Sequence, residues 1–154
     1  MKAVAKDFKT QHLVAWDSRL DEGLTLIGAE PPIDKEAIQD AIESCLAKLR
    51  RNEDFSKISN KPATALGTIW GWTITSAFQW KWKVLEISTD EGEYDRVCLG
   101  ICDPEMRYMY SPEELFPRMV DHPEIPGPKQ RFAAIKSGNL PSAVPGALVD
   151  LGQQ

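Results

Sequence analysis

The chain has 154 residues, of which 42% are hydrophobic and 27% charged, and its formal net charge is −5. These values are typical of a folded domain with a sizeable core, and they exclude a largely disordered chain. The acidic balance disfavours nucleic-acid binding, which depends on a basic face against the phosphates.

A helix is predicted near the N-terminus over residues 5–21. Its apolar residues recur every four positions, at Phe8, His12, Trp16 and Leu20. Gly23 is expected to end this helix.

A second helix is predicted from Lys35 to Arg51. Asp34 is suited to cap it, because its carboxylate can accept hydrogen bonds from the free backbone N–H groups of the first turn. The apolar stripe of this helix consists of Ile38, Ala41, Ile42, Cys45, Leu46 and Leu49. Residues 52–61 are expected to form a polar loop.

A third helix is predicted from Pro62 to Phe78, since proline suits the first helical turn. Ala63, Gly67 and Gly71 form a stripe of small residues along it. Each glycine costs about 1 kcal/mol of helix propensity relative to alanine. Two glycines on one stripe therefore predict the close approach of another backbone or of a large ring.

Three strands are predicted next, over Trp80–Ser88, Tyr94–Cys102 and Arg107–Tyr110. The apolar side of the first strand switches at Val84–Leu85, which predicts a bulge or a bend of the strand there. A turn at Asp103–Glu105 is expected to join the second strand to the third.

Two short helices are expected to follow the strands. Ser111–Glu114 has the pattern of a capping box, and Pro117 is expected to shorten or kink the helix that begins there. Lys129–Ser137 is predicted to be helical and to end at Gly138. Residues 139–154 contain further proline and glycine and are expected to form a loosely ordered tail.

These elements predict an α+β fold, in which N-terminal helices pack on a three-stranded antiparallel meander that is followed by short C-terminal helices. We expect one domain over residues 1–154, with its core within about 33–120.

The stretch from Ala65 to Arg118 resembles a small bacterial domain family of unknown function. The resemblance rests on a Leu-Gly-x-x-Trp-Gly helix, an aromatic-x-Trp strand and a helix that contains proline. The matching residues are Leu66, Gly67, Trp70, Gly71, Trp80, Trp82 and Pro117. Such domains are similar to immunity proteins encoded beside secreted antibacterial toxins, so the resemblance implies a binding role and no known enzymatic one.

The residues that usually carry catalysis are sparse in this chain. His122 can be paired with Cys102 or Ser111 only by assumption, and the cysteines are better explained as packed thiols and His122 as a loop residue. Cys98 and Cys102 lie four residues apart on a predicted strand, about 13 Å, which is too far to share a zinc ion. We therefore expect no enzyme, no catalytic residue, no metal and no cofactor.

Two further observations bear on where in the cell the protein is located and whether it binds a membrane. The three cysteines are an odd number and disfavour a disulfide framework. Lys6, Asp7 and Lys9 interrupt the region where an export signal needs apolar residues, and no segment has the ~20 apolar residues of a transmembrane helix. We expect a cytoplasmic protein, monomeric or homodimeric, that binds neither membrane nor nucleic acid.

Two surface features are predicted to bind a partner. Trp72 lies about 200° around the third helix from Trp70, so both rings cannot easily face one core surface. The expected hairpin between the first two strands concentrates carboxylates around a tyrosine. The predicted partner-binding residues are Trp72, Asp90, Glu91, Glu93, Tyr94 and Asp95.

Two functions remain open from the sequence. The first is an immunity protein that neutralises a cognate secreted toxin by direct binding, and the acidic balance of the chain predicts that this toxin is basic. The second is a small-molecule or carbohydrate-binding module, or an unrecognised enzyme, built around the tryptophan cluster. A simple solvated loop and an aromatic core would explain the same residues without a function.

Overall fold

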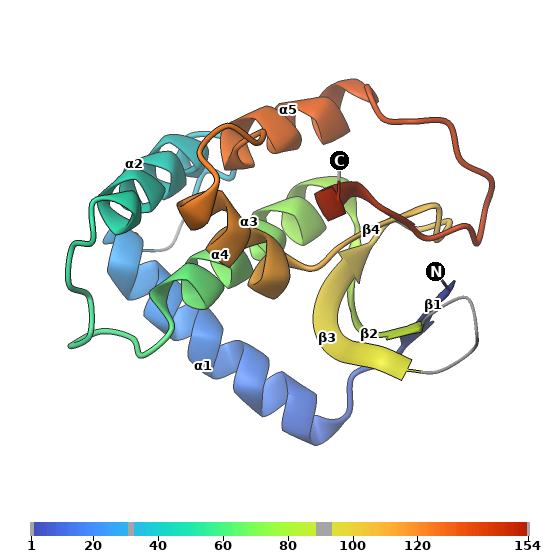
Figure 1. The fold of residues 1–154 in the computed structure, drawn as a ribbon, viewed down its shortest axis with the longest axis horizontal. Coiled ribbons are helices and arrows are strands. Elements are labelled where there is room, and N and C mark those ends of the chain that lie inside the picture. The colour runs from blue at the N-terminus through green and yellow to red at the C-terminus, as the bar shows by residue number, and fades with distance from the viewer. Residues whose placement is uncertain (1, 31–32, 89–93, 154) are drawn as a thin grey trace.

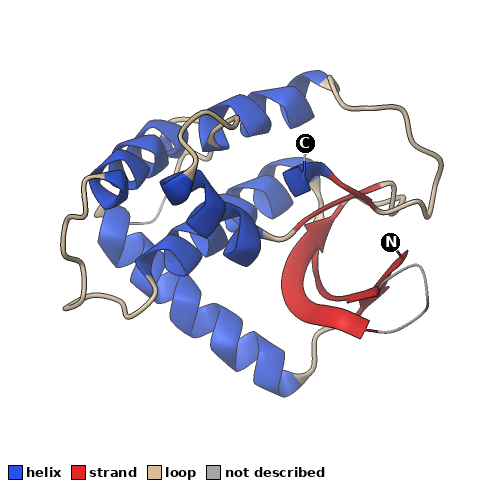
Figure 2. Cartoon of the chain, viewed as in Figure 1, coloured by secondary structure: helices blue, strands red, loops and turns tan. Residues whose placement is uncertain are grey.

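The computed structural model describes residues 2–30, 33–88 and 94–153 (Figure 1). The fold class is α+β, as expected, and Figure 2 shows the helices gathered on one side of the molecule and the strands on the other. The helices are α1 (Thr10–Ile27), α2 (Ile38–Arg50), α3 (Pro62–Phe78), α4 (Pro112–Asp121) and α5 (Pro128–Ser137). The strands are β1 (Lys2–Lys6), β2 (Lys81–Ser88), β3 (Tyr94–Cys102), β4 (Tyr108–Tyr110) and β5 (Val149–Asp150).

The sheet is larger than the predicted three-stranded meander. Its order is β1-β2-β3-β4-β5, and β5 pairs with β4 in parallel while the other pairs are antiparallel. The central three strands are the predicted ones. The two edge strands come from the chain ends, and local sequence patterns do not reveal pairings between residues so far apart.

The N-terminal region differs from its prediction at both ends of the helix. Lys2–Lys6 form β1, in register with β2 from Ser88 to Val84, so α1 starts only at Thr10. The helix also runs through Gly23 to Ile27 and ends at Gly28, which has a φ of 65°. Gly23 does not end α1 but lies where α3 crosses it. A Cβ at this position would lie 2.6 Å from the Ala65 carbonyl oxygen of α3.

There is no bulge in β2 at Val84–Leu85, which was one of the two predicted alternatives. The register shift lies between Ile87 and Ser88, and Val84 and Leu85 pair regularly with β3. The apolar side switches in the sequence because both faces of β2 are covered, so that Val84 and Leu85 are both buried.

Helices α3 and α5 match their predictions closely, whereas α2 begins at Ile38, three residues later than predicted, and ends at Arg50. α3 begins at Pro62 and ends at Phe78, and α5 ends at Gly138. The predicted start of α4 at Pro112 is also correct, but Ser111 makes no side-chain cap and Pro117 does not end the helix. Phe116 and Met119 are fully buried on either side of Pro117, and their packing holds the helix together to Asp121.

The C-terminal residues differ from the expected loose tail. Val149 and Asp150 pair with Tyr108 and Met109 of β4, and Leu151 is buried in the main core. Two arginines hold the segment from the helices: Arg118 Nη1 donates to the Gly152 carbonyl oxygen at 2.6 Å, and Arg131 Nη1 donates to that of Leu151 at 2.9 Å.

Two apolar clusters lie on the two faces of the curved sheet. The larger one joins all five helices to the sheet, with the Trp70 ring fully buried in it and its indole N–H donating to the Pro128 carbonyl oxygen at 3.0 Å. The smaller one comprises Leu85, Ile87, Cys98, Cys102, Met109 and Leu148. The helices cover the face of β3 that carries Ile101, as Figure 1 shows for the curved strand.

Candidate functional site

Most of the predicted acidic hairpin lies outside the described residues. This holds for Asp90, Glu91 and Glu93, whereas Tyr94 and Asp95 are described only as the first backbone positions of β3. The hairpin therefore stays a prediction, and Trp72 is the predicted site residue that the structure places.

The tryptophan cluster divides into core rings and one outer ring. Trp70 is fully buried and Trp80 is 6% exposed, and both contact Tyr110. Trp82 is partly buried and makes edge contact with Trp16. Trp72 lies half-buried on the other side of α3, where the Lys35 ammonium stands 5.8 Å from its ring centroid. This distance is typical of a cation–π contact.

The glycine stripe of α3 has the close neighbours that the sequence predicts. A Cβ at Gly67 would lie 2.6 Å from the Pro112 carbonyl oxygen at the start of α4. A Cβ at Gly71 would lie 2.6 Å from the ring of Trp82. One glycine thus admits a backbone and the other a large ring, as the sequence predicts.

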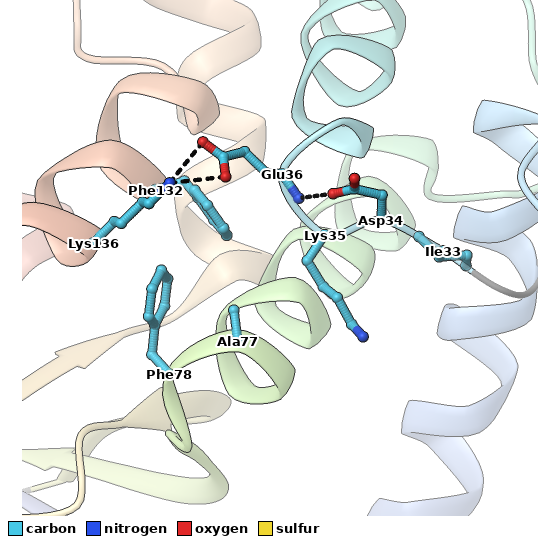
Figure 3. Close-up of a pocket in the computed structure, with 8 residues that line it drawn as sticks. All are labelled: Ile33, Asp34, Lys35, Glu36, Ala77, Phe78, Phe132 and Lys136. Carbon is cyan, nitrogen blue, oxygen red and sulfur yellow. Dashed lines mark hydrogen bonds and ion pairs between the residues drawn. The ribbon is translucent and has the colours of Figure 1, made fainter.

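An open groove of about 580 Å³ lies between the turn before α2, the end of α3 and α5 (Figure 3). Trp72 does not line this groove, but Lys35 does, and its ammonium is the group that stands over the Trp72 ring. Its apolar floor is formed by Phe78 and Phe132, whose ring centroids are 5.0 Å apart at an interplanar angle of 51°. The complete lining is Ile33, Asp34, Lys35, Glu36, Ala77, Phe78, Phe132 and Lys136. Groove volumes of this order are common for small-molecule sites.

Asp34 shapes the turn that forms one wall of the groove. Its Oδ1 accepts hydrogen bonds from the backbone N–H of Glu36 at 2.9 Å and of Ala37 at 3.1 Å. The bonds from Ala37 and Glu36 hold the pKa of this carboxyl below its usual value. Asp34 was predicted to cap α2 itself, but it caps the turn of residues 34–37 that leads into the helix, and the N-cap position of α2 is Ala37.

The groove carries one ion pair across its rim. The Lys136 ammonium donates to both carboxylate oxygens of Glu36 at 2.8 Å, which joins α5 to the turn before α2 (Figure 3). Both side chains are more than half exposed, so solvent screens the pair and its contribution to stability is small.

A buried polar contact lies one helical turn behind the groove. Gln39 follows Lys35 by one turn, and its Nε2 donates to the Lys35 carbonyl oxygen at 3.0 Å and to Thr73 Oγ1 at 2.9 Å. Thr73 in turn donates to the Trp70 carbonyl oxygen at 2.6 Å. These bonds tie the Lys35 backbone to α3 and make this wall of the groove rigid.

A second, more polar groove lies between α1, β3 and α4. Its charges are matched, because Arg19 binds Glu113 and Arg96 binds Glu114, each at 2.7 Å. Glu113 also accepts a hydrogen bond from the backbone N–H of Leu99 at 2.8 Å. Leu99 lies in the part of β3 that β4 does not pair with. These carboxylates therefore serve the fold.

The cysteines are packed thiols, as the sequence predicts. Cys45, Cys98 and Cys102 are all free and buried. Burial raises the pKa of the Cys98 and Cys102 thiols to about 12 in each case, so both are protonated at neutral pH. Within residues 2–30, 33–88 and 94–153, no three His, Cys, Asp or Glu side chains are grouped so that they could hold a metal ion.

Sequence reasoning identified Trp72 and Asp34 but missed the groove. Phe78 and Phe132 lie 54 positions apart in the chain, and their contact has no local signal.

The chain matches no protein-family model, no curated protein and no solved structure. The resemblance to immunity proteins therefore stays a prediction. In the described part of the chain, no helix combines the length and apolar character needed to cross a membrane.

Proposed function

We propose that this protein acts by binding another protein, and that Trp72 and the adjoining groove form the contact surface. The observation that carries the proposal is a half-buried tryptophan that shares its neighbour Lys35 with an open groove, whose floor is aromatic. Tryptophan is strongly enriched among the residues that dominate binding energy at protein interfaces. Neighbouring charged side chains on the rim, such as Glu36 and Lys136, suit the polar border of such an interface.

In its more specific form, the proposal is that the protein is a cytoplasmic immunity protein that neutralises a cognate secreted toxin. The resemblance of residues 65–118 to immunity-like domains and the net charge of −5 support this assignment. A basic partner would be attracted electrostatically, and the carboxylates of Asp90, Glu91 and Glu93 would add charge-assisted hydrogen bonds.

The test is to co-express the protein with the product of the neighbouring gene in its native genome. We expect a complex that can be co-purified and that protects cells from the neighbour's toxicity. Replacing Trp72 by alanine should weaken the complex about tenfold or more, as expected for a central aromatic contact. A matched control is Val144→Ala, because Val144 is 71% exposed and lies outside the groove.

Two results would contradict the proposal at different levels. A complex that Trp72→Ala and Val144→Ala weaken equally would reject the contact surface. A neighbouring product that neither binds nor is toxic would reject the immunity role.

A small-molecule-binding module is the second candidate, and the size of the groove favours it. The tryptophan cluster itself does not provide the platform for stacking, since Trp70 and Trp80 are buried in the core. The groove is the place where such a ligand would bind.

A further inference from the structure

The groove floor fits an apolar body about the size of one ring. Phe78 ends α3 and Phe132 lies on α5, and their tilted rings meet below the groove opening (Figure 3). Ile33 and Ala77 extend the apolar lining on the side of Lys35. A ligand with an aromatic or branched apolar group would remove these surfaces from water, which is the main source of favourable energy in such sites.

The charged groups around this floor are not equivalent. Lys136 and Glu36 hold each other, and the Asp34 carboxylate accepts two backbone N–H groups. The Lys35 ammonium has no carboxylate within ion-pair distance among the described residues. It feels the charge of the adjacent Asp34 and stands 5.8 Å from the centroid of the Trp72 ring. The cation that remains available at the rim is therefore Lys35.

We propose that this groove binds a small organic carboxylate with an apolar, ring-sized body. The body lies over Phe78 and Phe132, and the carboxylate accepts a charge-assisted hydrogen bond from the Lys35 ammonium. The rigid connection of the Lys35 backbone to Gln39 and α3 reduces the entropy lost on binding. This inference concerns the second candidate function, and it holds or fails independently of the toxin partner.

Three probes that share one ring and one chain length separate the roles of charge and apolar contact. They are phenylpropionate, phenylpropanamide and phenylpropylamine, each titrated into isotope-labelled full-length protein and followed by amide NMR. We expect phenylpropionate to shift the amide signals of Lys35, Phe78 and Phe132 and to bind about fivefold or more tightly than the neutral amide. The amine should bind most weakly.

Variants test which residue binds the carboxylate and where the apolar body lies. Lys35→Met keeps most of the side-chain length but removes the charge, so it should lower the affinity for phenylpropionate to that of the amide and leave the amide unchanged. Lys57→Met, at an exposed lysine in the loop before α3, is the matched control and should change neither affinity. Ala77→Trp should fill the groove and weaken all three probes, while the NMR spectrum reports whether the variant is folded.

The possible outcomes decide the proposal. Equal affinities for the carboxylate and the amine, or shifts confined to residues outside the groove, would overturn it. So would an unchanged affinity for phenylpropionate in Lys35→Met. A peptide that ends in phenylalanine is the final probe, and binding about tenfold tighter than phenylpropionate would assign the groove to a peptide C-terminus and overturn the small-molecule assignment.

Discussion

The two faces of α3 use the same residue type in opposite ways. On the inner face, the Trp70 ring is fully buried against Tyr110 and Phe116, and its N–H is satisfied by the Pro128 carbonyl oxygen. On the outer face, Trp72 is half-buried and its ring faces the Lys35 ammonium. A rotation of about 200° around one helix therefore separates a core tryptophan from a partly exposed one, and each can be replaced alone.

The inner face is also the more constrained one. Near it lie Gly67 and Gly71, where an added Cβ would meet the Pro112 backbone or the Trp82 ring. Space remains at the C-terminal end of α3, where Ala77 is exposed and lines the groove. Four predictions test this contrast, beginning with the largest effect.

Replacing Trp70 by alanine should lower the free energy of unfolding by about 3–5 kcal/mol, the range for a large aromatic side chain deleted from a core. The loss includes the hydrogen bond to Pro128, whose carbonyl oxygen would be left without this donor. Urea unfolding followed by circular dichroism measures the change. A loss below about 1 kcal/mol would show that the inner face is not the stabilising one.

The two glycines should differ although their sequence setting is the same. Gly67→Ala should destabilise by about 1–3 kcal/mol despite the better helix propensity of alanine, because the new Cβ meets the Pro112 backbone. Gly71→Ala should cost less, since the Trp82 ring can shift. Urea midpoints of the two variants give the comparison, and an equal or reversed order would contradict the packing described for α3.

Trp72→Ala should change the free energy of unfolding by no more than about 1 kcal/mol, as is usual for a partly exposed position. The same variant is expected to lose partner binding, so its thermal unfolding serves as the control for the binding experiment. A loss comparable to that of Trp70→Ala would mean that Trp72 is a core residue.

The smallest effect should come from Asp34, and it should depend on pH. Its pKa is lowered in the folded protein, so its contribution is complete above the usual aspartate pKa and is lost as the pH falls through the folded-state value. Asp34→Ala should therefore lower Tm by about 2–4 °C near pH 7 and by less near pH 3. Melting curves at both pH values measure this, and an equal difference at both would contradict the capping role.

Much of the helical structure could be predicted from the chain alone. Pro62 marks the start of α3, Gly138 marks the end of α5, and the stripe from Ile38 to Leu49 marks the buried face of α2, because these signals act within a few residues. The close approach at Gly67 and Gly71 was equally visible, since glycine in a helix needs a packing reason.

The edges of the sheet and the candidate site were decided by tertiary contacts. β1 pairs with residues more than 75 positions away, and Gly23 lies inside α1 because α3 crosses it there. For the site, the sequence by itself determined that Trp72 faces away from Trp70 and that Asp34 caps a turn. Only the folded chain brings Phe78, Phe132 and Lys35 together, because side chains from distant segments meet through packing, which short-range patterns do not encode.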